Sequence, residues 1–128
     1  MREITVVVNS RNKKAVLSVP ECPALAKGFA DLTQGDVLAD GRDYAVCRAG
    51  DGRVSGVFWD ADGDPWTAKV TFTALPAAAS FVIRRYRMAG DVRTEVPEKT
   101  LRRYANSAGI LEVKIPAEAG EVMVFAQE

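Results

Sequence analysis

Histidine is absent from all 128 residues of the chain. Its absence excludes Ser-His-Asp and Cys-His catalytic systems, excludes zinc sites that depend on histidine, and removes the side chain that most easily titrates near neutral pH. The 17 acidic residues mostly fall in turns or alternate with apolar residues, so no carboxylate pair stands out as a general acid and base. No glycine-rich phosphate loop of the form GxxxxGK[ST] is present. We therefore expect that the chain is not an enzyme.

Cysteine is scarce, with only Cys22 and Cys47 in the chain. Two cysteines are too few for a disulfide scaffold, and they lack the CxxC spacing of redox and zinc motifs. A reduced cysteine behaves as a small hydrophobic residue, so we expect two free thiols, one of them buried. A single disulfide between a loop and a strand is the alternative.

Net charge and long apolar runs are also missing. Lys+Arg and Asp+Glu both number 17, so no overall field attracts nucleic acid or an anionic membrane. The apolar run in "MREITVVVNS" is shorter than a signal-peptide core and far shorter than a membrane span. We expect a soluble chain whose partners are neither nucleic acid nor membrane, and the sequence leaves its compartment open.

Short β-branched runs separated by turn residues dominate what is present. A chain of 128 residues suits one domain, and strands at this spacing predict an antiparallel β-sandwich, of the immunoglobulin or fibronectin kind. In residues 1–40, Glu3–Val8 and Ala15–Val19 flank the polar "NSRNKK", which predicts a hairpin. "PALAKGFADL", residues 23–32, has apolar residues at helical spacing and predicts one short helix.

Residues 41–128 carry the clearest strand patterns. The segments "DYAVCRA", "RVSGVFW", "TAKVTFTAL" and "SFVIRRYRM" are joined by the turns "GDG", "DADGDP" and "PAAA", which together predict a meander. "ILEVKIPAEAGEVMVFAQ" predicts a final hairpin around "PAEAG", with Leu111, Val113 and Ile115 facing inward and Glu112 and Lys114 facing water. The stretch "TEVPEKTLRRYANSAG" predicts either a helical turn after Pro97 or an irregular loop. In total we expect about seven to nine strands and one short helix.

The stretch "DADGD" places Asp60, Asp62 and Asp64 at alternate positions. An EF-hand calcium loop has carboxylates at positions 1, 3 and 5, a glycine at position 6 and a bidentate glutamate at position 12. Counted from Asp60, position 6 is Pro65 and position 12 is Thr71, so half of the pattern is missing. An Asx-type turn is the preferred interpretation, because Asp and Gly are the residues such turns select. A Ca²⁺ site at the three aspartates is the weaker alternative, and no other cofactor is expected.

Aromatic residues surround this turn. Alternation along a strand puts Phe58 and Trp59 on opposite faces, so we expect one of them to lie near solvent. An exposed aromatic ring can stack on a sugar ring, but large aromatic residues are also common in protein cores and interfaces. The candidates for oligosaccharide binding are Trp59, Trp66, Tyr86 and Tyr104.

Residues 41–126 resemble the C-terminal β-sandwich of the family 39 glycoside hydrolases, the β-xylosidase and α-iduronidase group. The resemblance rests on "GRDYAVCRAGDGRVSGVFWD", "AKVTFTALPAAASFVIRRYRM" and "ILEVKIPAEAGEVMVFAQ". Matching positions are Tyr44, Asp51, Gly52, Trp59, Asp60, Leu75, Pro76, Arg85, Tyr86 and Arg87. After "YRM" the chain departs from the family, because "AGDVRTEVP" replaces a segment rich in His, Ser and Asn. "PALAKGFADL" would take the place of the last barrel helix.

The resemblance implies an accessory domain and not a catalytic one. The family's two catalytic glutamates lie on a (β/α)8 barrel, which a chain of this length cannot contain, so no catalytic residue carries over. The first hypothesis is therefore a non-catalytic β-sandwich that packs against a catalytic barrel or another partner domain. An independent carbohydrate-binding module is the second hypothesis. A structural or assembly protein that acts by self-association, such as a phage or cell-surface subunit, is the third.

Overall fold

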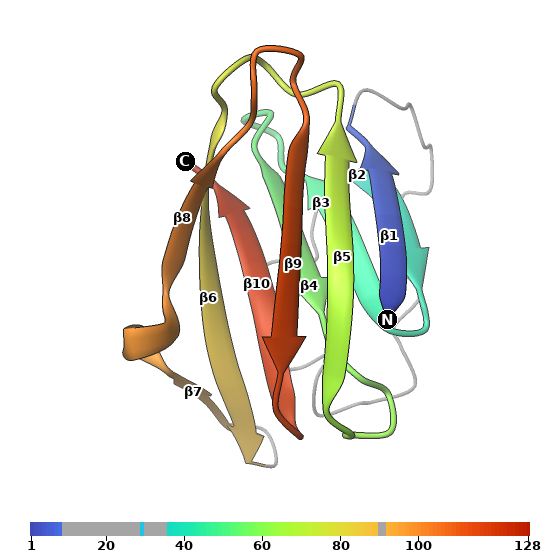
Figure 1. The fold of residues 1–128 in the computed structure, drawn as a ribbon, viewed down its shortest axis with the longest axis vertical. Coiled ribbons are helices and arrows are strands. Elements are labelled where there is room, and N and C mark those ends of the chain that lie inside the picture. The colour runs from blue at the N-terminus through green and yellow to red at the C-terminus, as the bar shows by residue number, and fades with distance from the viewer. Residues whose placement is uncertain (9–28, 30–35, 90–91) are drawn as a thin grey trace.

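The fold of the chain is an all-β sandwich, as the sequence predicts (Figure 1). A computed structural model describes residues 1–8, 29, 36–89 and 92–128. Within these residues ten strands form two layers, a three-stranded sheet and a seven-stranded sheet. No helix in the described ranges has the length and apolar character needed to cross a membrane.

The three-stranded sheet has the strand order β1-β5-β9. Its strands are β1 (Arg2–Val7), β5 (Trp66–Thr73) and β9 (Leu111–Ala117). Buried and more exposed residues alternate along β5 and β9, with Val70, Phe72, Leu111, Val113 and Ile115 buried. This alternation confirms the prediction for β9, and it leaves a polar outer face in which threonine, lysine and glutamate predominate.

The seven-stranded sheet has the order β2-β3-β4-β10-β6-β7, and β8 also pairs with β6. Its strands are β2 (Asp36–Gly41), β3 (Tyr44–Arg48), β4 (Val54–Phe58), β6 (Ser80–Ala89), β7 (Val92–Glu95), β8 (Leu101–Tyr104) and β10 (Glu121–Gln127). A 3-10 turn, η2 (Pro97–Lys99), connects β7 to β8. The sheet therefore extends well beyond the three strands that face it (Figure 1).

The main core lies between the two sheets. Phe58, Phe72, Phe81 and Phe125 are almost fully buried there, and Phe72 stacks on Phe81 with ring centres 5.4 Å apart. Side chains from β1 belong to the same cluster as those from β9 and β10. The first strand and the last strands of the chain thus share one core, because each sheet must bury its apolar face against the other.

A second apolar cluster covers the outer face of the seven-stranded sheet. It contains Phe29, Ala45, Val57, Trp59, Val122 and Val124, with Tyr86 and Met88 packed against it. The ring of Phe29 meets the ring of Tyr86 edge-on, with centres 5.5 Å apart. Both faces of the central strands are therefore apolar and buried, as in a sheet covered on two sides.

Several sequence predictions about strand pairing are wrong. The connection "DADGDP" and the connection "PAEAG" do not close hairpins, because each carries the chain from one sheet to the other. Strand β9 pairs with β5, whereas β10 pairs with β4 and β6. Of the predicted meander, only the β3–β4 hairpin is confirmed. Short turns rich in Asp and Gly suit a reversal within a sheet and a crossing between sheets equally well.

Pairing in the sandwich is also not purely antiparallel. Strand β1 pairs with β5 in parallel, with Ile4 opposite Val70 and Val6 opposite Phe72. The sequence placed β1 in a hairpin with Ala15–Val19, which lies outside the described residues. So do Cys22 and the predicted helix at 23–32, apart from Phe29.

Three short strands were not predicted. Strand β2 falls in "DVLADG", which has no β-branched run, and β8 and the second half of β7 fall in the stretch assigned to a loop or helical turn. The turn after Pro97 is confirmed as η2. Cys47 is buried and free, so the prediction of a buried free thiol is confirmed for this residue. Burial, together with the nearby Asp40, raises the pKa of its thiol to about 11.

Candidate functional site

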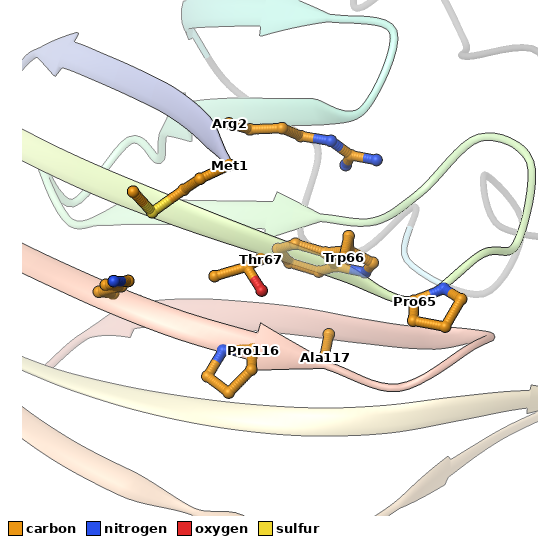
Figure 2. A pocket seen from close by; sticks show the side chains of 8 residues that line it. Met1, Arg2, Pro65, Trp66, Thr67, Pro116 and Ala117 are labelled. Carbon is orange, nitrogen blue, oxygen red and sulfur yellow. The ribbon is translucent and has the colours of Figure 1, made fainter.

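A groove of about 710 Å³ lies at one end of the three-stranded sheet, where β1 and β5 begin and β9 ends (Figure 2). It is lined by Met1, Arg2, Pro65, Trp66, Thr67, Lys114, Pro116 and Ala117. Five of these side chains are apolar, and the three polar ones are Arg2, Thr67 and Lys114. The groove therefore combines apolar walls with a few polar groups, the usual composition of a ligand site.

Strand register explains which side chains reach the groove. Thr67 lies directly opposite Pro116, and Trp66 lies opposite Ala117. Opposed residues share a face of the sheet, so Thr67 and Pro116 point to the outer face while Trp66 and Ala117 point inward. The indole Nε1 of Trp66 donates to the carbonyl oxygen of Glu121 at 3.3 Å, which fixes the ring across the end of the sandwich.

Arg2 joins the groove to the aspartate turn. Its Nη1 donates to the carbonyl oxygen of Trp59 at 2.8 Å, and its Nη2 forms an ion pair with Asp60. The guanidinium also lies over the ring of Trp66, 5.5 Å from the ring centre, and 3.8 Å from Asp43. The charge of Arg2 is therefore already balanced by carboxylates, and its main effect is to hold the end of β4 against the start of β5.

Lys114 is the other cationic side chain of the groove, and its setting is different. It lies directly opposite Lys69 on β5, and Lys69 forms an ion pair with Glu112 at 3.6 Å. Lys114 itself makes no ion pair with any residue that the structure describes. The side-chain ammonium of Lys114 is thus not matched by a carboxylate among the residues that the structure describes.

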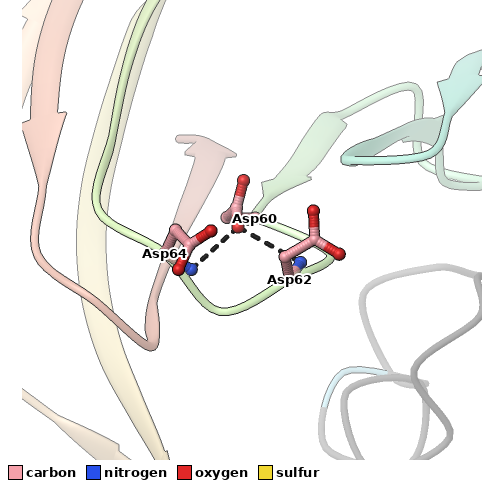
Figure 3. A group of neighbouring side chains, drawn as sticks. All are labelled: Asp60, Asp62 and Asp64. Carbon is pink, nitrogen blue, oxygen red and sulfur yellow. Dashed lines mark hydrogen bonds between the residues drawn. The ribbon is translucent and has the colours of Figure 1, made fainter.

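The three aspartates form a compact turn beside this groove (Figure 3). Oδ2 of Asp60 accepts hydrogen bonds from the backbone N–H of Asp62 at 3.1 Å and of Asp64 at 2.8 Å. Gly63, with a φ of +76°, donates its N–H to the carbonyl oxygen of Asp60. These are the bonds of an Asx-type turn, which confirms the preferred interpretation of "DADGD".

The calcium hypothesis for the same aspartates stays a prediction. One carboxylate oxygen from each of Asp60, Asp62 and Asp64 lies within 4.8 Å of the others, close enough to share an ion. Both oxygens of Asp60 already accept hydrogen bonds, and Asp62 pairs with Arg42 at 2.9 Å. Although burial raises the pKa of Asp60, the bonds from Asp64, Arg2 and Asp62 lower it below its ordinary value. Hydrogen bonds and ion pairs within the described residues thus already engage the carboxylates of Asp60 and Asp62.

The proposed sugar-stacking aromatics do not form one exposed platform. Phe58 and Trp59 are only 1% and 4% exposed, so the expectation that one of these two rings lies near solvent is wrong, and Trp66 is also buried, at 7% exposed. Phe58 is buried between the sheets, and Trp59 is buried on the other face by the second cluster. Sequence alternation placed both rings on the correct opposite faces. It did not show that both faces are covered.

The two tyrosines lie elsewhere in the fold. Tyr86 is half-buried beside Phe29, and the guanidinium of Arg93 lies over both rings. Tyr104 is 61% exposed on β8, opposite Ser80 at the far edge of the seven-stranded sheet. Of the four aromatics, only Trp66 lines the groove, and only Tyr104 offers a large exposed surface.

A buried ionic cluster lies behind Trp66. The side chain of Glu121 is completely buried, and its Oε2 lies 3.1 Å from the ammonium of Lys99. Its Oε1 accepts from the backbone N–H of Glu118 at 2.7 Å and lies 3.4 Å from Nη1 of Arg85. Burial raises the pKa of Glu121, but the bonds from Glu118, Lys99 and Arg85 outweigh it, and the pKa is lowered overall. Glu121 is therefore charged at neutral pH and holds three elements together.

Sequence reasoning missed Arg2, Lys114 and Pro116 as groove residues. Alternation along β9 already put Lys114 on the outer face, and Pro116 follows by the same rule. No local signal pairs β1 with β5, so Arg2 could be placed only by the tertiary structure. The ion cluster around Glu121 likewise joins residues that are far apart in the sequence.

No family model and no curated protein matches the sequence. Among solved structures, the fold is similar to the GH39 enzyme from Xanthomonas axonopodis pv. citri, with a TM-score of 0.58 and 13% identity over 78% of this chain. A monomeric β-xylosidase from Caulobacter crescentus CB15 gives a TM-score of 0.50 and 14% identity over 78% of this chain. The chain spans 28% and 29% of the length of these two proteins. The resemblance to a segment of family 39 glycoside hydrolases is thereby confirmed at the level of the fold.

Proposed function

We propose that this chain is a non-catalytic β-sandwich accessory domain of a glycoside hydrolase, which packs against a catalytic barrel or another partner domain. The proposal rests on the fold match, because a sandwich that covers 78% of this chain corresponds to less than a third of each GH39-type protein. A fold alone does not fix a function, so the surface must also suit the role.

The outer face of the three-stranded sheet is the surface that best suits packing. Val7 on β1 lies opposite Thr73 on β5. Leu111 lies opposite Phe72, so Ile110, the residue before Leu111, lies on the other side of Thr73. Val7 and Ile110 are 47% and 37% exposed, so two apolar side chains flank Thr73 at the end of the sheet away from the groove. Neighbouring exposed apolar side chains of this kind can form the centre of a domain interface.

Genomic context tests the proposal first. We expect a (β/α)8 barrel to be encoded in the same reading frame or in a neighbouring gene. The corresponding hydrolase should then form a stable complex with this chain, measured by light scattering and by a rise in the melting temperature of the hydrolase. A gene without any such barrel nearby, or a hydrolase that does not bind the chain, would contradict the accessory role.

Substitutions locate the interface within that experiment. V7E and I110E each place a charge at the proposed contact and should weaken the complex by roughly tenfold or more, because an unpaired charge is costly to bury. V92E is the matched control, since Val92 is 63% exposed on β7 of the other sheet. Equal weakening by all three variants would place the interface elsewhere.

A further inference from the structure

The groove at the end of the three-stranded sheet has an unusual balance of polar groups. Arg2, Thr67 and Lys114 all carry hydrogen-bond donors, and none of the described residues that line the groove carries a carboxylate side chain. Asp60 and Asp43 occupy the guanidinium of Arg2, whereas Lys114 makes no ion pair within the described part of the chain. The complementary ligand is therefore rich in acceptor oxygens and carries a negative charge.

The apolar part of the groove includes two proline rings. Pro116 lies opposite Thr67 on the outer face, and Pro65 directly precedes Trp66 at the start of β5. Proline rings cannot rearrange freely, so they present fixed apolar surfaces to a ligand. Lys114 and Pro116 are two residues apart on one strand, which separates them by about 7 Å along the sheet.

We propose that this groove binds an acidic saccharide, in which a uronate carboxylate pairs with Lys114. The C–H face of the sugar ring packs on Pro116, and the hydroxyl of Thr67 donates to a ring hydroxyl oxygen. A saccharide fits this surface better than an acidic peptide does, because one ring supplies a flat apolar face, several acceptor oxygens and a carboxylate within a short distance. A volume of about 710 Å³ lies within the usual size range of small-ligand sites.

The inference does not rest on the accessory role. The groove and the apolar pair Val7 and Ile110 lie at opposite ends of the same sheet, so either surface can function without the other. Failure to bind sugar would leave the accessory proposal standing, and failure to bind a hydrolase would leave the groove proposal standing.

Cellobiouronic acid and cellobiose form a matched pair of probes, since they differ only in the oxidation of one C6 carbon. Titration of the ¹⁵N-labelled chain should shift the backbone signals of Thr67, Lys114 and Ala117 with the acidic sugar. Cellobiose should bind at least about tenfold more weakly than cellobiouronic acid, because it lacks the charge-assisted bond to Lys114.

Two lysine variants separate the groove from general surface charge. K114Q should weaken binding of cellobiouronic acid by about tenfold, whereas K69Q should change it by less than about twofold, because Lys69 lies outside the groove and is paired with Glu112. T67V should weaken the binding of both sugars. Unfolding curves of the variants confirm that each of them folds.

Other outcomes would overturn the inference. Equal binding of the two sugars, no shift of the backbone signals with either sugar, or an unchanged affinity of K114Q for cellobiouronic acid would each contradict the uronate site. Tighter binding of an acidic tripeptide than of cellobiouronic acid would assign the groove to a protein partner instead.

Discussion

The ammonium of Lys99 lies 3.1 Å from Oε2 of Glu121, whose carboxylate is completely buried. Lys99 belongs to η2, and Glu121 begins β10. Arg85 on β6 and the backbone N–H of Glu118 complete the surroundings of this carboxylate. A buried charge of this kind is tolerated only when it is paired and hydrogen-bonded, so the contact is central to the stability of this end of the sandwich.

Replacement of Glu121 by glutamine tests that role. E121Q keeps the shape of the side chain but leaves Lys99 and Arg85 without their buried counter-charge. We expect a loss of about 3 kcal/mol in the free energy of unfolding, measured with urea. E118Q is the control, because Glu118 is 68% exposed and contacts the same Lys99 at 3.6 Å. The free energy of unfolding of E118Q should fall by less than about 1 kcal/mol. A similar decrease in E118Q and E121Q would contradict the importance of burial.

Acid should destabilise the protein through the same carboxylate. The pKa of Glu121 is lower in the folded chain than its ordinary value of 4.5. Its contribution to stability is therefore complete above that ordinary value and is lost as the pH falls through the folded pKa. Unfolding measured between pH 7 and pH 3 should show a steeper loss for the wild type than for E121Q.

A residual acid effect should remain in E121Q. Hydrogen bonds from Arg102 and Ser80 lower the pKa of Glu128 to about 2, and the pKa of Asp60 is also lowered. Identical pH dependence in the wild type and E121Q would show that Glu121 is not the group that responds.

The aspartate turn should depend on Asp60 and not on calcium. D60N weakens the pairing with Arg2 and with the backbone N–H groups of Asp62 and Asp64, so we expect a loss of about 1–2 kcal/mol. D64N is the control and should cost less than about 0.5 kcal/mol, because Asp64 contributes its backbone N–H to the turn. Millimolar CaCl₂ should leave the melting temperature of the wild type unchanged. A rise that disappears in D60N would instead establish the calcium site.

Gly109 and Gly120 form a matched pair for testing close backbone packing. Both have a φ of +75°, but a Cβ on Gly109 would lie 2.2 Å from the carbonyl oxygen of Leu75, whereas a Cβ on Gly120 meets nothing within 4 Å. G120A should cost about 1 kcal/mol for the left-handed conformation alone. G109A should cost more than about 3 kcal/mol, because the backbone must also move. Equal losses in thermal or urea unfolding would show that the connection before β9 relaxes freely.

Much of the local structure could be predicted because strand alternation is a local property. The residues of β5 and β9 alternate between inward and outward positions as their sequence indicates. The Asx-type turn at Asp60 was predictable for the same reason, since its bonds span only a few residues. Trp59 and Phe58 were correctly assigned to opposite faces.

Pairing between distant segments could not be predicted in this way. Whether a turn reverses a strand within its sheet or carries it to the other sheet depends on which neighbour is already present. Strand β10 is placed between β4 and β6, so β9 pairs with β5 instead of with β10. The covering of Trp59 by a second cluster that includes Phe29 follows from the same long-range packing.

Residue type and alternation act over a few positions, so they are enough to specify an all-β sandwich, the faces of its strands and the absence of histidine chemistry. Long-range packing sets the parallel pairing of β1 with β5, the burial of Glu121 against Lys99 and Arg85, and the groove that Lys114 shares with Pro65 and Trp66. These contacts join segments whose proximity is set by the packing of one sheet on another. Their energies depend on burial that no local pattern encodes.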